Sequence, residues 1–191
     1  MMRIEDWKED DLSEEQLSVY NEIIKGPRGK VVGPLKIWLN NAEFASCAQA
    51  LGKYARYESN LTTALSELVI ITTGRCWSSN FEWEQHAPLA KKAGINIKYI
   101  NQIASANRPI FKNHEQQAVY DFTAEANIKK NVSDKVYNKA YKLLGKNALI
   151  DIVGICGYYN LISMTLNVFR VPQEGSDWPL PKINNLNNML P

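Results

Sequence analysis

The segment from Ala148 to Phe169 places the strongest limit on what this chain can fold into. It is 22 residues long, and Asp151 is its only charged side chain. Such a segment is long enough to cross a bilayer, but a carboxylate near the centre of a spanning helix costs about 3 kcal/mol. No other segment of the chain resembles it. We therefore expect a buried helix of a soluble protein and no membrane partner.

Helical periodicity covers most of the remaining sequence. Apolar residues recur at spacings of three and four, and helix-capping residues precede several of these stretches, namely Ser13 with Gln16, Asn41, and either Thr62 or Thr63. The β-branched run from Leu68 to Thr73 belongs to a pattern too long for one strand. The sequence therefore predicts an all-α fold. The expected helices cover residues 13–25, 41–55, 62–72, 79–93, 97–105, 114–127, 133–144 and 147–168.

The length of 191 residues favours one domain. We expect residues 1–172 to form this single helical domain. The segment after Val171 contains four prolines and no hydrophobic period, so residues 173–191 are predicted to form an extended arm on their own or a neighbouring subunit.

Charge and cysteine content exclude several classes of protein. The chain has 22 Lys and Arg against 20 Asp and Glu, with no run of like charge, so nucleic acid is not an expected partner. The spacing of Cys47, Cys76 and Cys156 fits neither a disulfide framework nor a zinc site. Reduced thiols indicate a cytoplasmic protein, and the acidic N-terminus lacks the apolar core of a secretory signal. No phosphate loop, dinucleotide fingerprint or metal motif occurs, so we expect neither cofactor nor metal.

His86 is the first candidate for chemistry. Glu82 precedes it by four residues, which places both side chains on one face of a helix. A carboxylate beside an imidazole orients the ring and raises its basicity, as a proton-transfer residue requires. A solvated surface pair is the alternative. The other histidine, His114, lies at a predicted helix start and is expected at the surface.

Glu67 and Cys76 are further candidates. Glu67 lies within an apolar run, where a carboxylate needs a partner, so it either meets His86 across adjacent helices or lies on a polar helix edge. Cys76 follows Arg75, a neighbour that can lower the pKa of a thiol. A small, inert packing residue is the alternative for Cys76.

Several segments in the same order resemble the carboxymuconolactone decarboxylase family, within the alkylhydroperoxidase-D-like superfamily. The matching segments are Gly33–Leu39, Leu65–Leu68, Glu82–Ala87, Ala93–Gly94, Gly157–Tyr159, Ser163–Met164, Leu166–Asn167 and Val171–Pro172. The resemblance implies an all-α fold in which a helical hairpin carries the active site. It also implies a homo-oligomer, a trimer or a hexamer, with sites near subunit contacts.

The superfamily's thiol peroxidases carry a Glu, then eleven residues, a CxxC pair, three residues and a His. On this chain Glu67 takes the Glu position, Ser79 and Glu82 take the two cysteine positions, and His86 takes the His position. Because both cysteines are absent, the disulfide cycle cannot operate as it stands. Cys76 lies three residues before Ser79. The Glu82 to His86 pattern instead resembles the decarboxylase side of the family, which needs no cysteine.

The resemblance implies a cofactor-free lyase that transfers protons and decarboxylates a small, carboxylated, lactone-like substrate. His86 would be the proton-transfer residue, oriented by Glu82 and assisted by Glu67, and Arg75 is a candidate to hold the substrate carboxylate. One alternative is an antioxidant protein with peroxiredoxin-type activity, lacking the CxxC pair and using Cys76. The other is a non-catalytic, ligand-binding member of the family.

Overall fold

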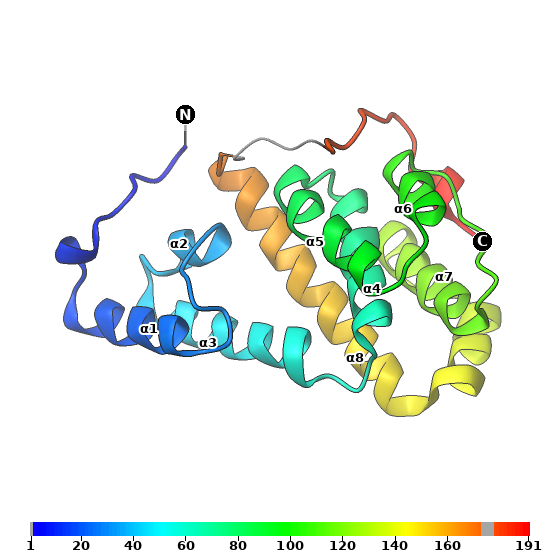
Figure 1. Cartoon of the computed structure of the whole chain (residues 1–191), viewed down its shortest axis with the longest axis horizontal. Helices are drawn as coiled ribbons and strands as arrows, with labels where there is room; N and C mark the ends of the chain where they lie inside the picture. Colours follow the sequence, from blue (N-terminus) through cyan, green and yellow to red (C-terminus); the bar gives the residue numbers. More distant parts are fainter. Residues whose placement is uncertain (1, 173–177) are drawn as a thin grey trace.

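Helices alone make up the regular structure of the described part of the chain. The computed structural model describes residues 2–172 and 178–191, and within these ranges it contains no strand (Figure 1). The α-helices are α1 (Glu14–Lys25), α2 (Pro34–Trp38), α3 (Ala42–Lys53), α4 (Thr63–Cys76), α5 (Asn80–Lys92), α6 (Ile97–Ala104), α7 (His114–Lys129) and α8 (Asp134–Phe169). Single turns η1 (Glu9–Asp11), η2 (Tyr54–Glu58) and η3 (Asn187–Met189) complete the elements. The all-α prediction is confirmed.

The predicted caps account for where several helices begin. The Ser13 hydroxyl accepts from the backbone N–H of Gln16, and the Gln16 side chain accepts from the N–H of Ser13, which forms a capping box. Asn41 caps α3, and Thr62 caps α4. These side chains satisfy N–H groups that have no partner within the helix.

Helix α8 contains the long apolar segment. At Gly145 the backbone has φ 79° and ψ 173°, which a glycine adopts without strain, so the halves on either side correspond to the two predicted helices. Within the described residues α8 is the one helix long and apolar enough to cross a membrane, and 61% of its most apolar 18-residue stretch is buried inside the protein. Asp151 is 3% exposed. This burial is typical of a core helix.

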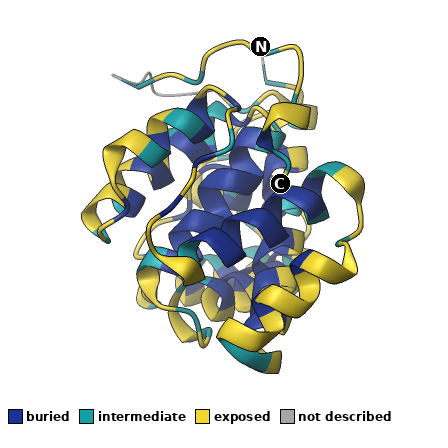
Figure 2. Cartoon of the chain, turned by 90° about the vertical axis from the view of Figure 1, so that its right-hand side faces the viewer, coloured by how far each residue is buried: buried dark blue, intermediate teal, exposed yellow. Residues whose placement is uncertain are grey.

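Helix α4 lies at the centre of the fold and contacts α5, α6, α7 and α8. Every residue from Leu65 to Arg75 is buried, and the run from Leu68 to Thr73 is helical, as predicted. Helix α8 runs between the α1–α3 group and the α4–α7 group (Figure 1), and the buried residues fill the middle of the second group (Figure 2). The Trp38 indole donates to the Thr165 hydroxyl at 2.9 Å and links α2 to α8.

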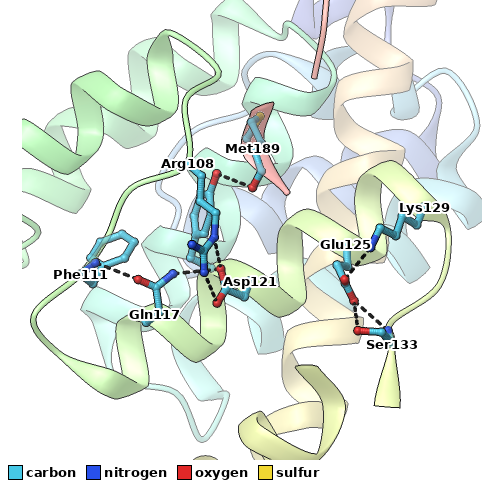
Figure 3. A network of polar contacts seen from close by, with 9 residues as sticks. Arg108, Phe111, Gln117, Asp121, Glu125, Lys129, Ser133 and Met189 are labelled. Carbon is cyan, nitrogen blue, oxygen red and sulfur yellow. Dashed lines mark hydrogen bonds and ion pairs between the residues drawn. The ribbon is translucent and has the colours of Figure 1, made fainter. Parts of the chain in front are cut away.

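The described part of the C-terminal arm packs on its own chain. The Trp178 ring meets that of Trp83 edge-on, and buried Met189 accepts a hydrogen bond at its carbonyl from the Tyr120 hydroxyl. This contact lies beside a polar network in which Asp121 accepts from Arg108 and Gln117 (Figure 3). Residues 173–177 of the predicted arm lie outside the described residues.

Candidate active site

The hairpin of α4 and α5 brings together the three residues that the sequence singled out for proton transfer. Nδ1 of His86 lies 2.7 Å from Oε2 of Glu67, across the two helices. Nε2 of His86 lies 3.5 Å from Oε2 of Glu82, one turn earlier on α5. The expected contact between Glu67 and His86 is therefore present. The Glu67–His86 distance is shorter than the Glu82–His86 distance. Glu67 is therefore the residue that orients the imidazole, and not Glu82 as the sequence predicted.

Tyr159 on α8 completes the surroundings of the imidazole. Its hydroxyl lies 3.3 Å from Nε2 of His86, and the two rings meet edge-on at 5.2 Å. The imidazole is thus held by a carboxylate at one nitrogen and faces a hydroxyl and a second carboxyl group at the other. This arrangement suits an imidazole that receives and delivers protons at Nε2.

The two hairpin helices pack directly against each other at Gly74 of α4. A Cβ at this position would lie 3.4 Å from the Cβ of Glu82, in ordinary van der Waals contact. The turn between the helices passes through Ser78, whose φ is 50°. Together these features place Glu82 and His86 of α5 against Glu67 of α4.

Burial changes the acidity of two groups at the site. Glu82 is 4% exposed, and burial raises its pKa, while nearby His86, Arg56 and Arg28 oppose the rise. Burial also raises the pKa of Tyr159 well above its usual value. The site therefore favours a protonated Glu82 carboxyl group and a neutral Tyr159 hydroxyl, both beside Nε2 of His86.

A cavity of about 100 Å³ opens onto this cluster. Glu82, His86 and Tyr159 line it, whereas Glu67 lies behind the imidazole. Apolar walls come from Val32, Pro34, Leu35, Phe81, Leu89 and Ile162, and the cations at the cavity are Arg28, Lys30 and Arg56. Glu82 and His86 are each 4% exposed and line this pocket, so the alternative of a solvated surface pair is wrong. The other histidine, His114, is exposed as expected.

Two residues named from the sequence, Arg75 and Ser79, lie away from this cavity. The Arg75 guanidinium donates to Ala104, Pro181 and Ser78, so it cannot hold a substrate carboxylate beside His86. Ser79 is the buried N-cap of α5 and does not line the cavity.

Cys76 has the wrong environment for a reactive thiol. Burial raises its pKa to about 12, and the nearby charge of Arg75 only partly opposes this. Arg75 does act to lower the pKa of Cys76, as expected, but burial outweighs this effect and the pKa is raised overall. Cys47, Cys76 and Cys156 are all free thiols, and Cys156 is buried with its pKa raised to about 11.

Three site residues escaped the sequence-based search: Tyr159, Arg28 and Arg56. Tyr159 could have been found from the sequence, because it belongs to Gly157–Tyr159, a segment that resembles the family. Arg28 lies in a glycine- and proline-rich loop and Arg56 at the end of a predicted helix, where only tertiary packing identifies them. Among the described residues, no group of three or more His, Cys, Asp or Glu is arranged to hold a metal ion.

Comparisons with known proteins identify the architecture. No protein-family model matches the sequence, and no curated protein matches it. An uncharacterized peroxidase-related protein from Silicibacter sp. TM1040 superposes with a TM-score of 0.71 at 14% identity, over 90% of this chain and 91% of its own. A peroxidase-related protein from Ralstonia eutropha JMP134, described as an alkylhydroperoxidase AhpD core, gives 0.71 and 14% over 91% and 93%.

A third solved structure agrees with these two. A protein of unknown function from Agrobacterium tumefaciens, described as a candidate antioxidant defence protein AhpD, gives a TM-score of 0.60 at 12% identity, over 76% of this chain and 100% of its own. At these identities the likeness concerns the fold. This chain therefore has the AhpD-like helical fold, and its α4–α5 hairpin carries the candidate site.

Proposed function

We propose that this protein is a cofactor-free enzyme that decarboxylates a small, carboxylated, lactone-like substrate through proton transfer at His86. One observation carries the proposal: Glu67 holds Nδ1 of His86 at 2.7 Å, while Nε2 faces a pocket shared with Glu82 and Tyr159. An imidazole fixed in this way presents one nitrogen to a substrate in a known orientation.

The chemistry needs a proton donor in the pocket. When the bond between the substrate and its carboxylate carbon breaks, CO₂ leaves and the bonding electron pair remains on the substrate, delocalised into the lactone carbonyl. That carbon must then receive a proton. Burial raises the pKa of Glu82, which favours the protonated form of a carboxyl group that lies 3.5 Å from Nε2 of His86. The two residues deliver this proton to the substrate, and water restores it.

The alternatives have weaker support. Peroxide reduction is favoured by the likeness to peroxidase-related structures. It requires a thiolate, whereas Ser79 and Glu82 occupy the thiol positions and the pKa of Cys76 is raised to about 12. A non-catalytic role is favoured by a Glu82–His86 pair that faces open solvent, whereas both side chains are buried at a pocket.

The test measures CO₂ release from a carboxylated lactone by the purified protein. We expect turnover in the wild type and in Cys76→Ser, and loss of turnover in His86→Gln with the fold retained by circular dichroism. Turnover that survives His86→Gln would remove the assignment. Consumption of alkyl hydroperoxide that is lost in Cys76→Ser would instead establish the peroxidase alternative.

We also propose that the protein is a cytoplasmic homo-oligomer. Apolar side chains on the outer face of α8 support self-association, since Ile150 is 62% and Val153 56% exposed. Light scattering coupled to size-exclusion chromatography should give a multiple of 21.7 kDa, and a monomer at micromolar concentration would contradict this.

A further inference from the structure

Two arginines at the pocket have no acidic ion-pair partner in the part of the chain that the structure describes. Arg28 and Arg56 line the cavity together with Glu82 and His86, and their charges act on the carboxyl group of Glu82. Neither forms an ion pair with a carboxylate within the described residues. Arg28 bonds to a tyrosine hydroxyl and Arg56 lies over the Tyr57 ring, so neither guanidinium group is neutralised by an ion pair within these residues, which suits an anionic ligand.

The position of Arg28 is fixed by a close fit against α3 and α8. Its Nη2 donates to the Tyr158 hydroxyl at 3.2 Å. A Cβ at Gly52 would lie 2.0 Å from that hydroxyl and 2.2 Å from Nη2, so only a glycine leaves room for the contact. The Nε of Arg28 is buried and has no hydrogen-bond partner within the described residues. Burial of this end of the side chain holds the guanidinium group in place at the edge of the cavity.

The position of Arg56 depends on an unusual turn. It lies in the π-helical turn η2. Such turns are rare in proteins, and where they occur they are often found at functional sites. Buried Asp151 of α8 fastens the segment on both sides of Arg56. It accepts from the Tyr54 hydroxyl at 2.7 Å, and from the backbone N–H and side-chain amide of Asn60 at 2.7 and 2.8 Å.

We propose that Arg28 and Arg56 bind the carboxylate of a small organic acid and orient it over Glu82 and His86, with Asp151 as the positioning residue for Arg56. This rests on the proposed function in that it names the substrate class of the same site. The small cavity, about 100 Å³, limits the ligand to a compact acid. Two planar guanidinium groups match carboxylate oxygens better than a point charge does.

The experiment measures binding of succinate and of its neutral counterpart succinamide by isothermal titration calorimetry. We expect succinate to bind the wild type and succinamide to bind at least tenfold more weakly. Arg28→Gln and Arg56→Gln should each weaken succinate binding by about tenfold or more. Lys98→Gln, which removes an exposed cation on α6, should leave it unchanged. Equal binding of the two compounds, or arginine variants that behave like Lys98→Gln, would overturn the proposal.

Asp151 is tested by coupling to Arg56. Asp151→Asn should weaken succinate binding in the wild type and have no further effect in Arg56→Gln, because it acts through that arginine. If Asp151 has only a general structural role, Asp151→Asn should weaken succinate binding equally in the wild type and in Arg56→Gln. That result would remove Asp151 from the proposal.

The outcomes separate this proposal from the proposed function. His86→Gln should lose turnover and keep succinate binding. A protein that binds succinate through both arginines but releases no CO₂ from a carboxylated lactone refutes the proposed function alone. Turnover that is unaffected in Arg28→Gln and Arg56→Gln refutes the role of the arginines alone.

Discussion

Replacing Gly52 by alanine tests the packing that places Arg28 at the pocket. The new Cβ would lie 2.0 Å from the Tyr158 hydroxyl and 2.2 Å from Nη2 of Arg28. Tyr158 is 1% exposed and meets Trp38 and Tyr159 edge-on, so its ring cannot move without disturbing the core. The flexible end of Arg28 can move. We therefore expect the substitution to displace Arg28 from Tyr158 and to strain the ring.

The magnitude follows from three opposing contributions. Overpacking in a closed space costs about 1–3 kcal/mol, and loss of the Arg28–Tyr158 hydrogen bond costs about 1 kcal/mol. Alanine gains about 1 kcal/mol over glycine in a helix. Gly52→Ala should therefore lower the free energy of unfolding by roughly 2 kcal/mol. Gly154→Ala on α8 is the matched control, because its Cβ meets nothing within 4 Å, and it should raise that free energy by up to about 1 kcal/mol.

Urea denaturation followed by circular dichroism at 25 °C measures both variants, and light scattering checks that each keeps the mass of the wild type. Succinate binding is then measured on the same samples. We expect opposite signs of the stability change, and weaker succinate binding in Gly52→Ala alone. If Gly52→Ala stabilises the protein as much as Gly154→Ala does, the reasoning about the fit of Arg28 is refuted.

Three further predictions concern the surroundings of the site. The pKa of Cys76 is raised to about 12 from an ordinary 9.0, so at neutral pH this residue should hold about a thousandfold less thiolate than an ordinary thiol. Ellman's reagent should therefore react rapidly with exposed Cys47 alone. A fast phase of the reaction that persists in Cys47→Ser contradicts this prediction. The pKa of Glu82 is raised in the fold from an ordinary 4.5, so the wild type loses stability as pH rises through that raised pKa. Glu82→Gln should match the wild type near pH 4 and exceed it at pH 8 in urea denaturation, and an equal difference at both pH values argues against a buried proton. Gly33 has φ 58°, and a Cβ there would lie 2.6 Å from the Phe81 ring, whereas Gly29 has φ 67° and a Cβ there would meet nothing within 4 Å. Gly33→Ala should therefore lower the free energy of unfolding by about 1–3 kcal/mol more than Gly29→Ala does. Equal shifts of the melting temperature in the two variants would show that the Phe81 ring moves aside without cost.

Local sequence rules accounted for most of the fold. Caps such as Ser13 and Asn41, and the helical spacing of apolar residues, determine where helices begin and which face they bury, and both depend on residues a few positions apart. The same spacing placed Glu82 beside His86. The π-helical turn at Tyr54–Glu58 was missed, because its local sequence continues the pattern of α3 and the contacts with Asp151 come from 90 or more positions away.

The site was only partly predictable for the same reason. A buried carboxylate such as Glu67 signals a need for a partner, and the order of the two helices made His86 the natural choice. No local pattern shows that Arg28 reaches a tyrosine 130 positions later, or that Arg75 turns toward Ala104 and away from His86. These positions follow from how α3, α8 and the C-terminal arm pack, which single-sequence reasoning does not determine.

The central claim is that Glu67 holds Nδ1 of His86 and leaves Nε2 to exchange protons in the pocket. Nitrogen-15 NMR of the imidazole rings measures this directly, because the chain has only two histidines and His114 is exposed, which makes it an internal reference. For neutral His86 the account predicts the tautomer with its proton on Nδ1. In Glu67→Ala we expect a shift toward the tautomer with the proton on Nε2, while the signals of His114 stay unchanged. A neutral His86 protonated on Nε2 in the wild type would contradict the account.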